Sequence, residues 1–189
     1  PLGNNGAPTG GYLAVSAHYT DGPFENRQSY ARNNLFGKWT APVGSSAEFV
    51  ATAAGHDSRW DASGQIPERA VAAGTMSRYG SLDPSEGGNT QRYAASVAGR
   101  PHEAGPAQWE ARAYAIRYGL QLYSNFTFFL NDSINGDGIE QQDRRTVVGG
   151  EGRVRLPVGL SAGAGIRADA IDLGLYSQRA RQRLSARVA

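Results

Sequence analysis

Residues 109–150 decide the fold, and they read WEARAYAIRYGLQLYSNFTFFLNDSINGDGIEQQDRRTVVGG. Between Ala113 and Leu122, large apolar side chains alternate with small, polar or basic ones, so one side of this run is apolar. A polar loop follows, and a second alternating run begins at Thr146. Alternation over about ten residues, repeated across long polar loops, is typical of transmembrane β-barrels rather than of soluble sheets.

The rest of the chain divides into similar runs, because its 25 glycines cluster with Asn, Asp, Ser and Pro between them. We expect eight strands, at residues 10–20, 29–41, 46–58, 89–100, 107–123, 143–156, 159–171 and 178–188. Alanine is frequent and weakens strand propensity, which leaves a helical alternative for residues 104–118. That segment has no clean apolar face in helical projection, so we favour the strand.

The expected connections alternate between short and long. The short ones are 42–45, 101–106 and 157–158, and the long ones are 21–28, 59–88, 124–142 and 172–177. Every second connection of an up-and-down barrel lies on the same side of the membrane, with short periplasmic turns and long extracellular loops. The sequence therefore predicts that residues 59–88 and 124–142 face outside.

Alternation also assigns a lipid face and an interior face to each expected strand. The residues expected to face lipid include Leu13, Val15, Leu35, Trp39, Tyr114, Ile116, Leu120 and Val154. The residues expected to face the interior include Arg32, Arg92, Arg117 and Arg153. Arginine on the lipid face near the membrane midplane costs about 2–4 kcal/mol, so the many arginines belong in a water-filled interior.

Composition excludes several classes of function. The length of 189 residues suits one domain, and the absence of cysteine excludes disulfides and thiolate metal sites. The net charge is only +2 and the basic residues are dispersed, which argues against a nucleic-acid partner. The chain opens at Pro1 without the basic start and apolar core of a signal peptide, so we expect an internal piece of a longer protein.

Three stretches carry a family resemblance. The first is residues 60–92, WDASGQIPERAVAAGTMSRYGSLDPSEGGNTQR; the second runs from SNFTFFLND at 124–132 to DRR at 143–145. The third and weakest is Leu175-Tyr176-Ser177 followed by Arg181 and Arg183. In this order and spacing they resemble the barrel of TonB-dependent outer-membrane receptors.

The resemblance implies an all-β, antiparallel transmembrane barrel segment of about eight strands, roughly a third of the 22-stranded barrel of such transporters. Residues 1–189 would form one partial barrel domain, without the plug and without the segment that engages TonB. The implied function is import of a scarce ligand, such as a ferric siderophore, cobalamin or an oligosaccharide, with no enzymatic activity and no cofactor. The implied location is the Gram-negative outer membrane, and the implied partners are its lipid, the ligand and, through the missing N-terminal part, the TonB complex.

Five residues are candidates for contacting the ligand, because aromatic and arginine side chains supply anchoring area and charge-assisted hydrogen bonds. They are Trp60, Arg69, Arg78, Tyr79 and Arg92. The alternative is that these side chains brace the long loop against the neighbouring strands.

Other site chemistries fit poorly. A calcium loop read through Asn135, Asp137 and Gly138 places Ser133 first and Arg144 last, so two ligands fail, and a tight Asn-Gly-Asp turn fits better. The three histidines, His18, His56 and His102, are far apart and no nucleophile-elbow pattern exists, so no hydrolase triad is expected.

An alternative function is a small autonomous eight-stranded barrel with a structural or adhesion role. Its narrow interior would require a carboxylate partner for each arginine. The interior arginines outnumber the candidate carboxylates, which favours the wider barrel; they are Arg32, Arg92, Arg100, Arg145, Arg153, Arg155 and Arg167.

Overall fold

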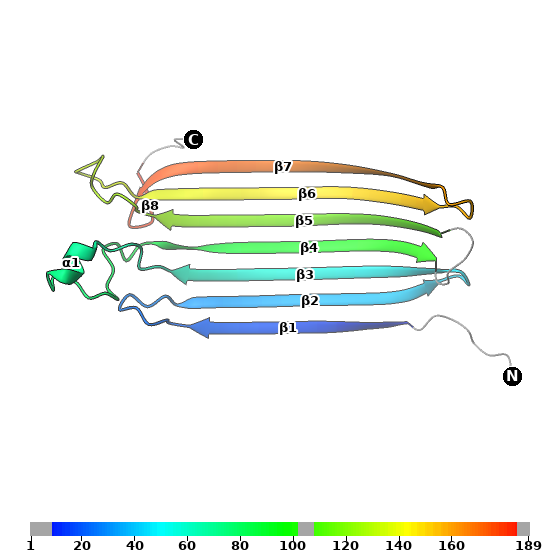
Figure 1. Cartoon of the computed structure of the whole chain (residues 1–189), viewed down its shortest axis with the longest axis horizontal. Helices are drawn as coiled ribbons and strands as arrows, with labels where there is room; N and C mark the ends of the chain where they lie inside the picture. Colours follow the sequence, from blue (N-terminus) through cyan, green and yellow to red (C-terminus); the bar gives the residue numbers. More distant parts are fainter. Residues whose placement is uncertain (1–8, 102–107, 185–189) are drawn as a thin grey trace.

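The computed structural model describes residues 9–101 and 108–184, and they form one antiparallel sheet (Figure 1). Its strands are β1 (Gly10–Thr20), β2 (Tyr30–Val43), β3 (Ala47–Asp61), β4 (Gly87–Pro101), β5 (Gln108–Ser124), β6 (Ile139–Arg155), β7 (Ser161–Arg179) and β8 (Gln182–Arg183). One short helix, α1 (Glu68–Ala72), lies in the loop between β3 and β4. The all-β prediction is confirmed. In the described part of residues 104–118 the structure has the strand β5 and not the alternative helix.

The strands follow one another across the sheet in the order β1 to β8. The long connections, 21–29, 62–86 and 125–138, gather at one end of the sheet, whereas the turns at 44–46 and 156–160 lie at the other (Figure 1). This confirms the predicted alternation, although the expected connection at 101–106 lies mostly outside the described residues. The end with the long connections is called the loop end below.

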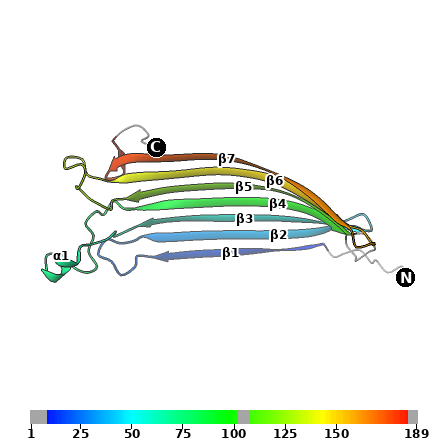
Figure 2. The same ribbon diagram turned by 45° about the horizontal axis from the view of Figure 1, so that its top comes forward.

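The sheet is a single curved layer (Figure 2). It does not close, because β1 pairs only with β2 among the described residues. Within the same residues Val147 is the one buried hydrophobic side chain, so no second layer covers either face. The backbone ladders and the contacts between neighbouring side chains therefore hold the strands together.

The C-terminal boundaries differ from the prediction. β7 continues to Arg179, so residues 172–177, expected to be a loop, are strand. Asp172 looks like a turn residue in the sequence, but it pairs with Arg144 of β6 and the ladder continues. Of the expected strand at 178–188, the first two residues belong to β7, β8 covers only Gln182–Arg183, and residues 185–189 lie outside the described part.

The pairing register assigns the two faces, because directly opposed residues share a face. The apolar face carries Leu13, Val15, Leu35, Trp39, Phe49, Val97, Val148, Val154 and Ile166. The basic face carries Arg32, Arg92, Arg100, Arg112, Arg145, Arg153, Arg155 and Arg167. For the strands other than β5, the predicted lipid and interior residues separate onto these two faces as expected.

The assignment of β5 is wrong. Arg117 pairs with Tyr93 and so lies on the apolar face, whereas Tyr114, Ile116 and Leu120 lie on the basic face. Both sides of β5 contain apolar residues, because Ala113 and Ala115 alternate with the larger side chains. The size of the apolar side chains therefore does not identify the apolar face of a single strand. The pairing register with β4 and β6 determines which residues of β5 lie on the apolar face and which on the basic face.

Several aromatic rings pack against glycines that lie on the adjacent strand or close by. The rings fill the space that a glycine leaves on the surface of the sheet. The Tyr114 ring covers Gly149 of β6, which pairs directly with it. A Cβ at Gly149 would come within 2.5 Å of the Tyr114 ring and 2.9 Å of the Ile166 carbonyl oxygen. The Tyr93 ring lies in the same way against its partner Gly55.

We expect Gly149→Ala to destabilise the sheet by about 1–3 kcal/mol, because overpacking displaces the ring or the backbone. Gly150→Ala is the matched control, since its Cβ would meet nothing closer than the Arg112 carbonyl oxygen at 3.4 Å. The measurement is the urea dependence of the β-sheet circular dichroism of the chain in detergent. Equal midpoints for the two variants would contradict this packing.

Candidate functional site

The loops at the loop end of the sheet contact one another. The Glu25 amide donates to the Tyr79 carbonyl oxygen at 3.0 Å, and the Asn26 side-chain amide donates to the Ala62 carbonyl oxygen at 3.1 Å. The rings of Phe24 and Tyr79 meet edge to face with centroids 6.1 Å apart. The first long loop therefore packs against the second.

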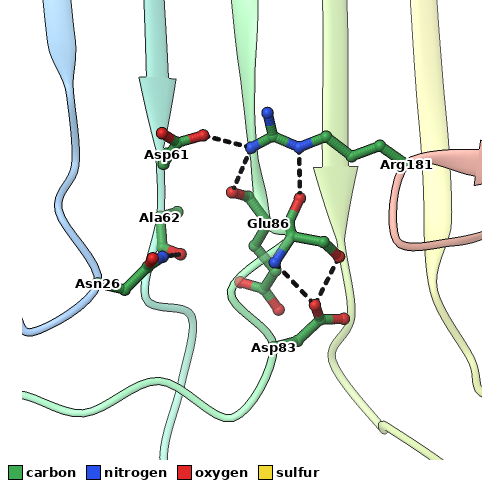
Figure 3. A network of polar contacts seen from close by, with 7 residues as sticks. Asn26, Asp61, Ala62, Asp83, Glu86 and Arg181 are labelled. Carbon is green, nitrogen blue, oxygen red and sulfur yellow. Dashed lines mark hydrogen bonds and ion pairs between the residues drawn. The ribbon is translucent and has the colours of Figure 1, made fainter.

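Arg181 joins three segments that are distant in sequence (Figure 3). Its guanidinium donates to Asp61 Oδ1 at 2.5 Å, to the Ser85 carbonyl oxygen at 2.7 Å and to the Glu86 carbonyl oxygen at 2.9 Å. The guanidinium carbon lies 5.3 Å from the centre of the Tyr123 ring. The side chain thus links the β7–β8 hairpin to the end of β3 and to the last residues of the loop 62–86.

The hairpin turn explains how Arg181 reaches this position. Ala180 and Arg181 both have positive φ, 50° and 64°, between the paired residues Arg179 and Gln182. Positive φ at both central residues is the geometry of the two-residue turns that match the twist of paired strands. The Arg181 amide also donates to Gln178 Oε1 at 2.7 Å, and Gln178 is buried.

Two carboxylates of the loop 62–86 hold Asn125 at the start of the next loop. The Asn125 amide donates to Glu86 Oε1 at 3.0 Å, and its side-chain amide donates to Asp83 Oδ2 at 2.8 Å. Burial raises the pKa of Glu86 above its usual range, against the lowering effect of the Asn125 amide. Burial also acts to raise the pKa of Asp83, but hydrogen bonds from Ser85 and Asn125 outweigh it and lower the pKa.

A second arginine of the hairpin anchors it to β6. Arg183 donates to both carboxylate oxygens of Glu140, at 2.6 and 2.7 Å, and lies 3.8 Å from the centre of the Tyr176 ring. Glu140 is 1% exposed and also accepts from Gln121 at 2.7 Å. A buried carboxylate that accepts from a bidentate arginine and from a further donor has its hydrogen-bonding capacity filled. Glu140 therefore has a structural role and is not a ligand-binding group.

The loop 125–138 is organised by Asp137. Its carboxylate accepts from the Thr127 hydroxyl at 2.6 Å and from the amides of Asn131 and Asp132, the closest at 3.0 and 2.8 Å. The Thr127 hydrogen bond is the main reason that the pKa of Asp137 is lowered to about 2. Because the folded pKa is depressed, this contribution to loop order is present above the ordinary pKa and is lost only as the pH falls through about 2.

The described residues contain no group of three or more His, Asp or Glu side chains placed to hold a metal ion. Asp132 accepts from the amides of Ile134 and Asn135 at 2.9 and 2.8 Å, as expected of a tight turn. His56 is hydrogen-bonded to Asn34 at 2.7 Å, and His18 lies 5.8 Å from the Tyr30 ring. His102 lies outside the described residues.

The five sequence-predicted ligand residues lie in separate places. Trp60 is half-buried near the end of β3 and Arg92 is exposed in β4, both on the basic face. Arg69 is exposed on α1. Arg78 lies 5.7 Å from the ring centre of Tyr79, which is 46% exposed and contacts the first loop.

Sequence reasoning missed Asp61, Asp83 and Glu86 as partners of a loop-end network. Asp61 lies in the loop expected at residues 59–88, and it is separated from Arg181 by 120 positions. Arg181 and Arg183 do stand in the weakest of the three family-like stretches, but nothing local indicates which carboxylates they meet. Only the folded sheet brings these groups together.

Comparison of the chain with protein-family models, with curated proteins and with solved structures finds no match. Within residues 9–101 and 108–184, no helix is long and apolar enough to cross a membrane.

We expect Arg181→Gln to loosen the loop 62–86, because the substitution removes the ion pair with Asp61 and the two carbonyl contacts. For a half-exposed arginine the loss is about 1–2 kcal/mol. The measurement is hydrogen–deuterium exchange of residues 62–86. Arg179→Gln is the control, since within the described part of the chain the Arg179 side chain makes only a 3.4 Å hydrogen bond to the Ile134 carbonyl oxygen. Unchanged exchange in Arg181→Gln would disprove that Arg181 holds this loop.

Proposed function

We propose that this chain forms part of the wall of an outer-membrane barrel of the TonB-dependent receptor type, which binds and imports a scarce ligand and has no catalytic activity. The ligand classes are a ferric siderophore, cobalamin or an oligosaccharide. Its partners are outer-membrane lipid, the ligand and, through an N-terminal part of a longer parent, the TonB complex. The support comes from the two faces of the sheet and from the loop end.

The observation that carries the proposal is an uncharged span on the apolar face. In six strands this face is free of charge over nine consecutive positions, at 11–19, 35–43, 47–55, 93–101, 146–154 and 162–170. In β5 the span is shorter, from Trp109 to Ala115, because Arg117 follows. A tilted strand crosses the hydrocarbon core of a membrane with about 9–11 residues.

The exposure of this face supports a lipid environment. Val15 and Ile166 are 71% and 79% exposed, and no described layer covers them. Contiguous apolar surface of this extent on a water-soluble protein favours association. Bilayer lipid covers such a face without a second protein layer, provided that further strands of the parent pair with the open edges.

The charges on the basic face support a wide, water-filled interior. Ion pairs join Arg100 to Glu48, Arg112 to Glu151, Arg153 to Glu110, Arg145 to Asp143 and Arg167 to Asp169. Arg32, Arg92 and Arg155 remain without an ion pair among the described residues. A narrow eight-stranded barrel has no water to solvate such charges, so this surplus disfavours the structural or adhesion alternative.

The membrane placement predicts opposite accessibilities on the two faces. Spin labels at Leu35, Val97 and Val148 are expected to be reached by oxygen dissolved in lipid, and labels at Ser96, Tyr114 and Arg153 by an aqueous quencher. The measurement uses the parent protein in liposomes. Within β5, Ala113 and Ala115 should follow the lipid group; loss of this alternation would exclude the barrel.

The transport role predicts an effect of the loop 62–86. Removing residues 62–80 deletes α1 but spares Asp83, Glu86 and Arg181, so the contacts of Arg181 at the strand ends remain. We expect the parent protein to assemble, as judged by heat-modifiable gel mobility, and to lose at least about tenfold in ligand affinity, the effect of losing one contact worth about 1.4 kcal/mol. A replacement of the turn 44–46 at the opposite end is the control, and wild-type uptake after the deletion would refute a ligand role for this loop.

A further inference from the structure

The basic face has two regions that differ in how their charges are balanced. The five ion pairs of this face join residues of β3 to β7. Near the loop end of β1 to β4 the same face carries His18, Arg32, His56 and Arg92, and none of them forms an ion pair among the described residues. These four residues are called the arginine–histidine cluster.

The pairing register places the cluster in one contiguous patch. His18 is directly opposite Arg32, and His56 is directly opposite Arg92. Arg32 pairs with Ser58, two positions from His56, so Arg32 and His56 are diagonal neighbours. Directly opposed residues have Cβ atoms about 5 Å apart and diagonal ones about 7–8 Å, within reach of long side chains.

The polar groups of the cluster are incompletely satisfied. Arg32 Nε is buried and has no hydrogen-bond partner among the residues that the structure describes. His56 is fixed by its 2.7 Å hydrogen bond to Asn34, and Arg92 is exposed beside it. A buried guanidinium N–H without an acceptor is uncommon in folded proteins and is costly unless another molecule supplies the acceptor.

We propose that the arginine–histidine cluster binds an anion with several carboxylate or phosphate oxygens, and that this is the charge class of the imported ligand. Two guanidinium groups on strands separated by about 10 Å suit an extended, multiply charged anion better than a single small ion. The statement about the imported ligand rests on the proposed function, whereas the binding site itself does not. The cluster lies toward the loop end, level with the Arg145–Asp143 pair, so a ligand that passes the long loops meets it before the Arg100–Glu48, Arg112–Glu151 and Arg153–Glu110 pairs.

The test measures binding of two probes, citrate and inorganic pyrophosphate, to the full chain in detergent by calorimetry, with sucrose as a neutral control. We expect saturable binding of at least one anion and none of sucrose. Arg32→Gln and Arg92→Gln should each weaken binding by about tenfold, the effect of losing one charge-assisted hydrogen bond. Arg155→Gln removes an exposed charge that has no ion pair within residues 9–101 and 108–184; it lies on the same face far from the cluster, so binding should weaken less than about twofold.

Equal weakening by Arg155→Gln would show diffuse attraction and overturn the site, and so would the absence of saturable binding of both anions. Should a Gln variant fail to form β-sheet, Arg92→Lys keeps the charge but loses the planar pair of donors, and it should bind with intermediate affinity. The quencher measurement separates this proposal from the barrel. If quencher accessibility alternates as expected but no anion binds, only the anion site is refuted. If an anion binds but the accessibility does not alternate, only the barrel is refuted.

Discussion

The structure depends on one feature of the sheet, which is that no second layer of described residues covers it. A single sheet buries almost none of its side chains, and Val147 is the one buried hydrophobic residue among those described. Most apolar burial must therefore come from the surroundings of the sheet, because the backbone ladder alone gives little net stability. Under the proposed membrane placement, lipid would cover the uncharged span of nine positions on each of six strands and would leave the opposite, arginine-rich face for water.

Much of this architecture could be predicted from the sequence. Strand positions, antiparallel order and the sorting of long and short loops follow from period-two alternation and from turn residues, which act locally. β5 shows where local information ends, since both of its sides are apolar and its orientation depends on the pairing of Tyr93 with Arg117. The extension of β7 shows the same limit, because Asp172 terminates a run in the sequence but pairs within the ladder in the fold.

The loop-end network was beyond local reasoning for a different reason. Arg181 meets Asp61 and Glu86 across 120 and 95 positions, and the turn at Ala180 and Arg181 directs the hairpin across the sheet. Carboxylates in a loop look solvated in the sequence, yet Glu86 is buried and holds the Asn125 amide. As a result the long loops are fixed at their bases, while Arg69, Arg78 and Tyr79 stay exposed farther along the same loop. A fixed base with exposed aromatic and basic side chains suits ligand contact, because ordering the loop base in advance lowers the entropic cost of binding.

The two regions of the basic face suggest a division of tasks along the sheet. Where Arg100, Arg112 and Arg153 each face a carboxylate on the neighbouring strand, the pair is neutral and adds cross-strand attraction without a strong net field. Arg32 and Arg92 have no such partner in the described strands and loops, so their positive potential extends into the adjoining space. Under the proposed function, the charges of Arg32 and Arg92 near the loop end would attract an anion toward the entrance, whereas the Arg100–Glu48 and Arg153–Glu110 pairs near the opposite end would attract it less strongly. The proposed import would require such a difference, because a pathway that bound its ligand equally strongly along its whole length would release it slowly.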